Sequence, residues 1–494
     1  MSLPQPPAIH TLPTELVREI VRASCDASAE LTLPFPTAKP PAISVSQFCS
    51  KWRVVAHNEC SLWQDFRVDL PDELDGGRYE ALMNFIANGA LGNRTCLVLR
   101  QGAYRPPHLN PVLPILVTHA QCMRSLSLNI PGQTVEQIFS TSVLPLNHLE
   151  TLSIAIRVTS QNDVSFLESP EDYVSTVFTA TPSLTRVTIG YDELMPITLE
   201  AFPLGAWGLP WGQLTEFNAP NIWIDVIQFF NIVDDCPNLV SCVLTLDAEG
   251  ADDPEDDNAR VTLVHLRKFH VTFLELYGWV WSNLILPSLV DLKIATYRDT
   301  MEWEDDVFEE FMVRSGCSLT HLALYFGFLD AIDAMLRIFD AAPDLQELTL
   351  RWTRLPGSDD EEWDVAPLMD YLTYQPHTVI KLPNLVKVLV DATPESVRML
   401  VSRCQAPAST LAEVVLYAEQ PSSCEALFAA EIGTLRAAGV QVVWERMVFL
   451  DQLEEIYDPN YSDGARTPRS SKESESDEGE YHLNGMPEES ASQS

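Results

Sequence analysis

The side chains that most often carry out chemistry are plentiful in this sequence, but none is arranged in a catalytic pattern. The ten histidines show no metal-ligand spacing, and no two of the ten cysteines have C-x-x-C spacing. The 20 glycines are dispersed and form no phosphate-binding loop. Neither G-x-S-x-G nor H-E-x-x-H occurs, and nothing selects an acid–base pair among the many carboxylates. We therefore predict no enzymatic activity and no catalytic, cofactor-binding or metal-binding residues. An enzyme of unidentified type is the least favoured alternative.

Three acidic runs are a possible exception, because clustered carboxylates can bind calcium. They occupy residues 252–257, 302–306 and 358–364. None has the alternating Asp-x-Asp-x-Asp-Gly spacing of an EF-hand loop. Solvated surface is the better interpretation.

The chain is strongly acidic, with 70 Asp and Glu against 31 Lys and Arg, giving a net charge of −39. Residues 451–494 hold twelve acidic and three basic side chains, so they contribute −9 and the remainder carries −30. This charge argues against nucleic-acid binding and would attract a basic protein partner. Alternatively, surface acid only keeps a large protein soluble.

The sequence begins without a secretory signal, and no stretch is apolar enough to span a membrane. Scattered cysteines without a disulfide framework suggest reduced thiols. We expect a cytoplasmic or nuclear protein that contacts no membrane.

A repeated pattern accounts for most of the chain beyond residue 70. Its unit is Leu-x-x-Leu-x-Leu with apolar substitutions, as in Leu149-Glu-Thr-Leu152-Ser-Ile154. Successive units start 23 to 40 residues apart, and five have a proline two residues before the first leucine. The units start at Met123, Leu149, Leu184, Leu214, Leu239, Leu266, Leu289, Leu319, Leu345, Leu385 and Leu411.

Helical candidates lie between these units. Apolar residues recur at helical spacing in 222–236, 307–313, 332–339 and 397–401. Strand followed by helix at this period predicts a solenoid with parallel inner strands and outer helices, closed by a capping strand at 440–444. A non-repeating α/β domain with buried strands is the alternative.

The pattern resembles leucine-rich repeats, although the regular asparagine of the commonest type is absent. Its turns must therefore be held by other means. In such strands the leucines point into the core, so the intervening side chains face the concave surface. Aromatic and basic residues there are candidate substrate-binding anchors, although a merely solvated sheet face is an equal alternative. They are Lys268, His270, Lys293, His321, Tyr325, Arg351 and Tyr417.

The segment 12–70 has a different pattern, of short amphipathic helices. Leu12, Leu16 and Ile20 are spaced by four, with Val17 and Val21 beside them. A second stripe comprises Val45, Phe48, Trp52 and Val55, and Leu62-Trp63 follows. Such short helices must pack together to be stable.

These pieces, in this order, resemble an F-box of the kind common in large fungal families. The resemblance implies docking to an Skp-type adaptor and, through it, to a cullin of a RING-type ubiquitin ligase. Four prolines between the helices predict a surface loop inserted at 24–42. The resemblance assigns adaptor binding to Leu12, Pro13, Leu16, Ile20, Val45, Phe48, Trp52, Leu62 and Trp63.

The sequence therefore predicts an α/β protein in four parts. They are a flexible N-terminus at 1–9, an F-box-like module at 10–70, a leucine-rich-repeat-like solenoid at 71–458 and a disordered acidic tail at 459–494. The expected function is substrate recognition for the ligase, with an unidentified protein substrate. The alternative is a repeat scaffold that binds or sequesters a partner without ligase assembly, its first helices serving as a cap.

Overall fold

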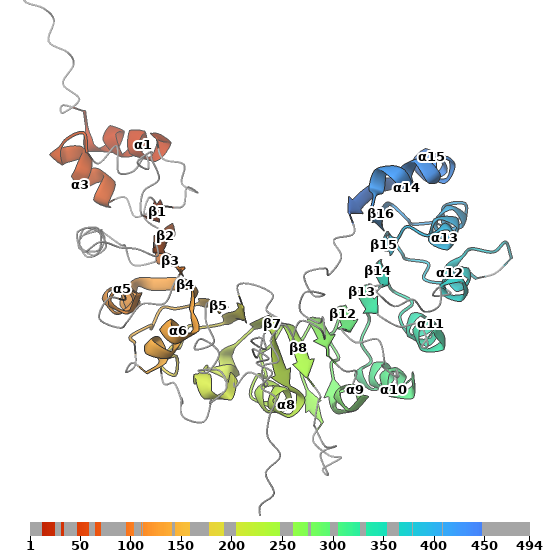
Figure 1. Ribbon diagram of the computed structural model, residues 1–494, viewed down its shortest axis with the longest axis horizontal. Helices are drawn as coiled ribbons and strands as arrows, with labels where there is room; N and C mark the ends of the chain where they lie inside the picture. Colours follow the sequence, from red (N-terminus) through yellow and green to blue (C-terminus); the bar gives the residue numbers. More distant parts are fainter. Residues whose placement is uncertain are drawn as a thin grey trace, which may run out of the picture. The chain divides into compact units, whose positions relative to one another are not determined.

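The computed structural model gives the fold of most of the repeat region and of two N-terminal helices (Figure 1). The acidic runs at 252–257 and 358–364, most of the run at 302–306 and the tail at 459–494 lie outside the described residues. So do Val45, Leu62 and Trp63. The structure describes residues 12–24, 31–33, 47–58, 65–70, 95–102, 110, 112–140, 144–158, 177–191, 204–247, 260–274, 278–296, 305–326, 332–352, 365–377, 379–407 and 409–446.

Fifteen strands form one sheet in which every strand is parallel to its neighbours. Strand order follows chain order, except that β9 (Val261–Thr262) and β11 (Leu284–Ile285) pair separately. The prediction of an α/β fold with successive parallel strands is confirmed. The strands of the large sheet are β1 (Leu31–Leu33), β2 (Asp65–Leu70), β3 (Thr95–Gln101), β4 (Met123–Pro131), β5 (Thr151–Arg157), β6 (Arg186–Tyr191), β7 (Glu216–Asp225), β8 (Ser241–Asp247), β10 (Lys268–Phe273), β12 (Asp291–Thr296), β13 (His321–Phe326), β14 (Glu347–Trp352), β15 (Lys387–Asp391), β16 (Glu413–Ala418) and β17 (Gln441–Arg446).

Each of the repeat units found in the sequence supplies one strand, from β4 to β16, and β17 is the terminal strand expected at 440–444. The sheet also contains three strands that the repeat pattern did not predict. β1 lies within the inserted loop predicted at 24–42, most of which is outside the described residues, so that segment contains one short strand. β2 lies within the predicted N-terminal module and pairs with β3, so hydrogen bonding continues from that segment into the repeats.

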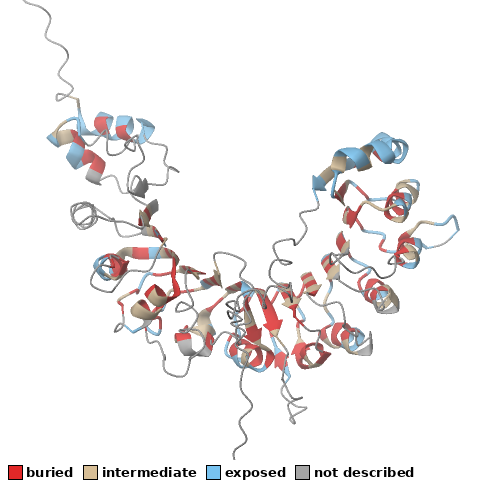
Figure 2. Ribbon diagram, in the orientation of Figure 1, coloured by how far each residue is buried: buried red, intermediate tan, exposed pale blue. Residues whose placement is uncertain are grey.

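Helices cover one face of the sheet (Figure 1), and along the strands buried residues alternate with less buried ones (Figure 2). Helices confirm the predictions at 307–313, 332–339 and 397–401. The helices that follow α1 (Thr14–Ser24) and α3 (Ser50–Asn58) are α5 (Val112–His119), α6 (Gly132–Phe139), α8 (Val226–Asp234), α9 (Gly278–Asn283), α10 (Asp305–Ser315), α11 (Ile332–Ala341), α12 (Ala366–Leu372), α13 (Pro394–Cys404), α14 (Pro421–Leu427) and α15 (Ala429–Ala437).

The helix predicted at 222–236 is partly wrong, because its first residues continue β7. The carboxylate of Asp225 accepts hydrogen bonds from the backbone N–H groups of Ile227 and Gln228, at 2.8 and 3.0 Å. An aspartate at this position caps the exposed N–H groups of a first helical turn. α8 therefore begins at Val226 and not at Ile222.

The prolines of the repeats lie in turns that lead into the strands. Just before β14, the N–H of Leu345 donates to the carbonyl of Ala342, which makes Pro343 the second residue of a four-residue turn. The turns at Pro182, Pro237, Pro287 and Pro383 have the same hydrogen bond. Proline is favoured at this position because its fixed φ matches the turn.

A ladder of shared carbonyls holds successive repeats together in place of an asparagine ladder. The carbonyl of Val290 accepts from the N–H groups of both Thr320 and His321, at 2.9 and 3.0 Å. The pattern recurs one repeat later, where the carbonyl of Thr320 accepts from Gln346 and Glu347. It runs through the repeats from Glu150 to Val386. Backbone carbonyls thus accept hydrogen bonds from the N–H groups at the start of each strand, the role for which the sequence offers no regular asparagine.

Candidate functional site

The seven predicted substrate-binding residues all lie on the sheet face away from the helices, which we call the open face. They occupy the strand positions that alternate with buried apolar residues, and all but the exposed His321 are half-buried. The open-face residues are Lys268 and His270 on β10, Lys293 on β12, His321 and Tyr325 on β13, Arg351 on β14 and Tyr417 on β16.

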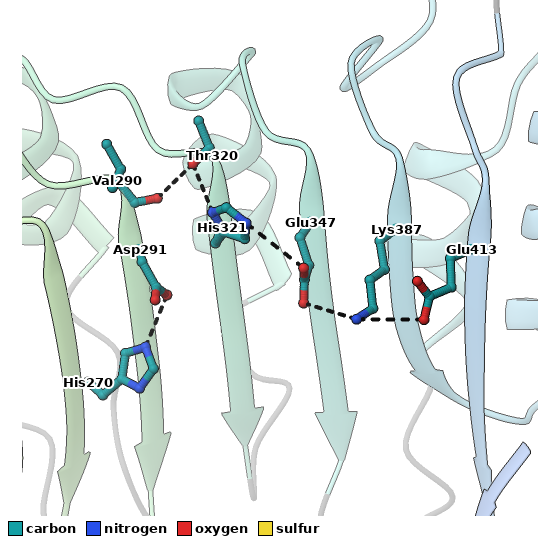
Figure 3. A network of polar contacts seen from close by, with 8 residues as sticks. All are labelled: His270, Val290, Asp291, Thr320, His321, Glu347, Lys387 and Glu413. Carbon is teal, nitrogen blue, oxygen red and sulfur yellow. Dashed lines mark hydrogen bonds and ion pairs between the residues drawn. The ribbon is translucent and has the colours of Figure 1, made fainter. Parts of the chain in front are cut away.

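A row of titratable side chains crosses the open face from β10 to β16 (Figure 3). His270 Nε2 lies 3.0 Å from Asp291 Oδ1, and His321 Nε2 lies 3.9 Å from Glu347 Oε2. Lys387 Nζ then lies between two carboxylates, 3.8 Å from Glu347 and 3.6 Å from Glu413. We call these six residues the charge ladder.

The Thr320 hydroxyl positions His321. It lies 2.8 Å from His321 Nδ1 and donates to the Val290 carbonyl.

The pKa of Asp291 reflects the neighbouring side chains of this row. Burial raises it, but the hydrogen bond and charge of His270, with the charges of Lys268 and His321, outweigh burial and leave the pKa below its usual value.

A second group, the tyrosine–cation cluster, comprises Lys293, Tyr325, Arg351 and Tyr417. Lys293 Nζ lies 4.4 Å from the centroid of the Tyr325 ring, and the Arg351 guanidinium carbon lies 3.9 Å from that of Tyr417. Both separations are typical of cation–π contacts. Strand register places Tyr325 directly beside Arg351.

Two carboxylates border this cluster. Arg351 Nε lies 3.3 Å from Asp391 Oδ1, and the two side chains are only 14% and 6% exposed. Glu445 on β17 pairs in register with Tyr417. Burial and a hydrogen bond to Glu445 raise the pKa of Tyr417 to about 12. Burial also raises the pKa of Tyr325, so both phenols are neutral at physiological pH.

The open face of β10 to β17 is nearly neutral, unlike the chain. Four cationic side chains, Lys268, Lys293, Arg351 and Lys387, face five carboxylates, Asp291, Glu347, Asp391, Glu413 and Glu445. The chain as a whole carries −39. Sequence reasoning missed these acidic partners because it selected only basic and aromatic residues. Aligning the repeat units would have placed them, since they occupy the same alternating positions.

The two described N-terminal helices pack against each other through a small apolar core. Val17 and Val21 of α1 are buried, as are Trp52, Val55 and Ala56 of α3. Leu12 is half-buried against this core, Lys51 donates to its carbonyl, and Pro13 is exposed.

A different part of α1 and of the turn before α3 is exposed and apolar. The exposed fractions of Leu16, Ile20 and Phe48 are 51%, 39% and 62%. The Phe48 ring lies edge-on to Trp52, with centroids 5.4 Å apart. Trp52 itself is only 4% exposed, so among the residues assigned to adaptor binding it belongs to the core of the module.

Within the described residues, no group of three or more histidine, cysteine or acidic side chains is placed to hold a metal ion. None of the helices in that part of the chain is long and apolar enough to cross a membrane. Compared with known proteins, the chain matches no protein-family model and no curated protein.

Proposed function

We propose that this protein recognises substrates for a cullin–RING ubiquitin ligase, with an F-box-like module that docks an Skp-type adaptor and leucine-rich repeats that bind a protein substrate. The observation that carries the proposal is the exposure of three apolar side chains, Leu16, Ile20 and Phe48. Short helices that bury one apolar face and leave another exposed are typical of a docking module. All three are among the residues that the F-box resemblance assigns to adaptor binding.

In this proposal the chain brings the substrate close to the ligase, and its partners catalyse the transfer of ubiquitin. The module would hold the protein on the ligase. The open face would hold the substrate near the ubiquitin-conjugating enzyme that carries the activated ubiquitin. Such tethering raises the effective concentration of the reacting groups. The alternating charges and aromatic rings of the open face support specific protein binding, since aromatic residues and arginine are favoured interface anchors.

The test is co-purification with an Skp-type adaptor. Leu16→Glu alters an exposed residue and should abolish adaptor binding without unfolding α1, because a buried charge at an interface is not tolerated. The double variant Leu12→Ala with Pro13→Ala should do the same, at a cost of about 2 kcal/mol or more in binding free energy. Leu427→Glu, at a site 72% exposed on α14, is the matched control and should bind normally. Adaptor binding by all three variants would remove the ligase proposal.

The second candidate is a scaffold that binds a partner without ligase assembly. It is favoured by the hydrophobic core, because Val17, Val21 and Trp52 belong to the same continuous cluster as the buried sheet residues. Terminal caps are a general need of repeat arrays. A chain that captures a partner through the open face and never recovers an adaptor or a cullin would fit this candidate.

A further inference from the structure

The cations of the open face differ in whether a carboxylate lies within ion-pairing distance. Lys387 Nζ lies at ion-pair distance from two carboxylates of the charge ladder, 3.8 and 3.6 Å away. Lys293 has no carboxylate within ion-pairing distance in the part of the chain that the structure describes, and its ammonium group rests on the Tyr325 ring. A ring face attracts a cation but does not accept its N–H groups as an oxygen would.

Arg351 is only partly satisfied as well. Its Nε faces Asp391, and its guanidinium plane stacks on Tyr417. Among the described residues, no hydrogen-bond acceptor is bound to its two terminal nitrogen atoms. Those nitrogen atoms form the fork that matches a carboxylate bidentately. The tyrosine–cation cluster therefore presents unused donors from two cations, which lie on β12 and β14 on either side of β13.

The local electrostatics also favour an anion, in spite of the acidic chain. Burial lowers the pKa of Lys293, and the positive charges of Lys268 and Arg351 lower it further. By contrast, the carboxylates of the charge ladder and of the cluster border already have partners: Asp291 has His270, Glu347 and Glu413 share Lys387, and Glu445 has Tyr417. On this part of the open face, the described groups that still lack hydrogen-bond partners are N–H donors, so the site would bind an acceptor.

From these contacts we infer that the tyrosine–cation cluster binds one carboxylate side chain, an Asp or Glu of the protein partner, between Lys293 and Arg351. The tyrosine rings would flank that residue and shield the ion pairs from water. A carboxylate fits better than a phosphate, because Asp391 and Glu445 border the site and would repel a second negative charge. Since the whole chain carries −39, the segment around the anchoring residue is expected to be neutral or basic.

This inference deepens the proposed function and rests on it only for the role of the open face in partner binding. Its test needs no adaptor, so it can fail while adaptor docking succeeds, and the reverse. The probes are three fluorescein-labelled peptides, Lys-Gly-Gly-X-Gly-Gly-Lys, with X as Glu, Gln or phosphoserine. Fluorescence anisotropy with the full chain, at low and moderate salt, gives the relative affinities.

The Glu peptide should bind about tenfold more tightly than the Gln peptide, the difference expected for a charge-assisted bidentate contact. Lys293→Met keeps the side-chain length and orphans no carboxylate, so it should fold normally and remove that preference. Arg351→Lys keeps a positive charge beside Asp391 but removes the two terminal nitrogen atoms that bind a carboxylate bidentately. It should therefore reduce the preference for the Glu peptide in part. Lys387→Met, in the charge ladder, is the control and should retain the preference.

Equal affinity for the Glu and Gln peptides would overturn the inference, as would an undiminished preference in Lys293→Met. Tighter binding of the phosphoserine peptide that depends on both Lys293 and Arg351 would overturn the choice of a carboxylate and assign the cluster to phosphorylated partners.

Discussion

Arg403 of α13 is buried, and within the part of the chain that the structure describes its side chain contacts backbone carbonyls and no carboxylate. Its two terminal nitrogen atoms donate to the carbonyls of Leu372, Lys381 and Leu382, at 3.0, 2.9 and 2.7 Å. Burial lowers the pKa of Arg403 to about 10. Leu382 has a positive φ of 48°, an unfavourable conformation for a leucine, and Arg403 holds it in place.

We predict that Arg403→Met lowers the free energy of unfolding by about 2 to 4 kcal/mol, because buried carbonyls lose charge-assisted hydrogen bonds. Arg403→Lys should recover only part of the loss, since one ammonium group cannot reach all three carbonyls. Urea unfolding followed by circular dichroism measures both effects. Arg398→Met, at an exposed position of the same helix, is the matched control and should change stability little. If Arg403→Met did not change the free energy of unfolding, other contacts would have to hold the segment that contains Lys381 and Leu382.

The pair of His270 and Asp291 predicts a dependence of stability on pH. The folded-state pKa of Asp291 lies below its usual value, so this carboxylate stabilises the fold above its unfolded-state pKa. That contribution is lost as the pH falls through the folded-state pKa. Asp291→Asn should therefore cost up to about 1 kcal/mol at pH 6, as expected for a partly exposed pair, and progressively less below pH 4.

A double-mutant cycle of Asp291→Asn with His270→Gln, repeated between pH 3 and pH 7, isolates this interaction. The coupling free energy should decrease as the pH falls below the unfolded-state pKa of Asp291. A coupling that stays constant down to pH 3 would exclude the ionised Asp291 as its source.

At the scale of the elements, the repeat pattern predicted nearly the whole sheet because one face of each strand is buried under helices. Burial of every second residue makes the pattern visible in sequence. The repeat pattern did not predict β1, β2 and β3, and β3 shows a physical reason. In β3 the alternation is present at Leu97 and Leu99, but Arg94 stands where the repeat requires its first leucine.

The open face was only partly predictable from the sequence. Alternation placed Tyr325 and Arg351 on it, but their neighbours depend on register, which hydrogen bonds between strands set. The contact of Arg351 with Asp391 and Tyr417 spans three strands and could not be read from a single repeat. On α1 the stripe at Leu12, Leu16 and Ile20 was recognised, whereas the buried face is that of Val17 and Val21. Both faces are apolar, so the sequence alone does not say which one packs.

The turn prolines give a prediction for the elements. Pro343→Ala should lower the free energy of unfolding by about 0.5 to 1 kcal/mol, because the unfolded chain gains backbone freedom while the turn hydrogen bond from Leu345 to Ala342 remains. Pro237→Ala should have the same effect in its own repeat. The two sites lie in distant repeats, so the double variant should show the sum of both losses. Stability that is unchanged or higher in the single variants would contradict the role assigned to these turns.

At the scale of the whole molecule, charge is unevenly distributed. The open face of β10 to β17 is close to neutral, and most of the −39 lies elsewhere. Net charge of this size keeps a protein soluble but destabilises its compact state by self-repulsion. A near-neutral face within such a chain is where a protein partner would meet the least repulsion.

The C-terminal residues 459–494 provide the last prediction, since they carry eight acidic and three basic side chains and very few apolar ones. Segments of this composition have little apolar surface to bury, so deleting them should change the free energy of unfolding by less than about 0.5 kcal/mol. Calorimetric melting of the full and shortened chains measures the effect. A third chain, with the eight acidic residues changed to their amides, separates charge from chain length. If the shortened chain melted several degrees lower while the amide chain did not, the tail would have to contact the folded body through uncharged groups. A loss in both would show that its carboxylates are bound there.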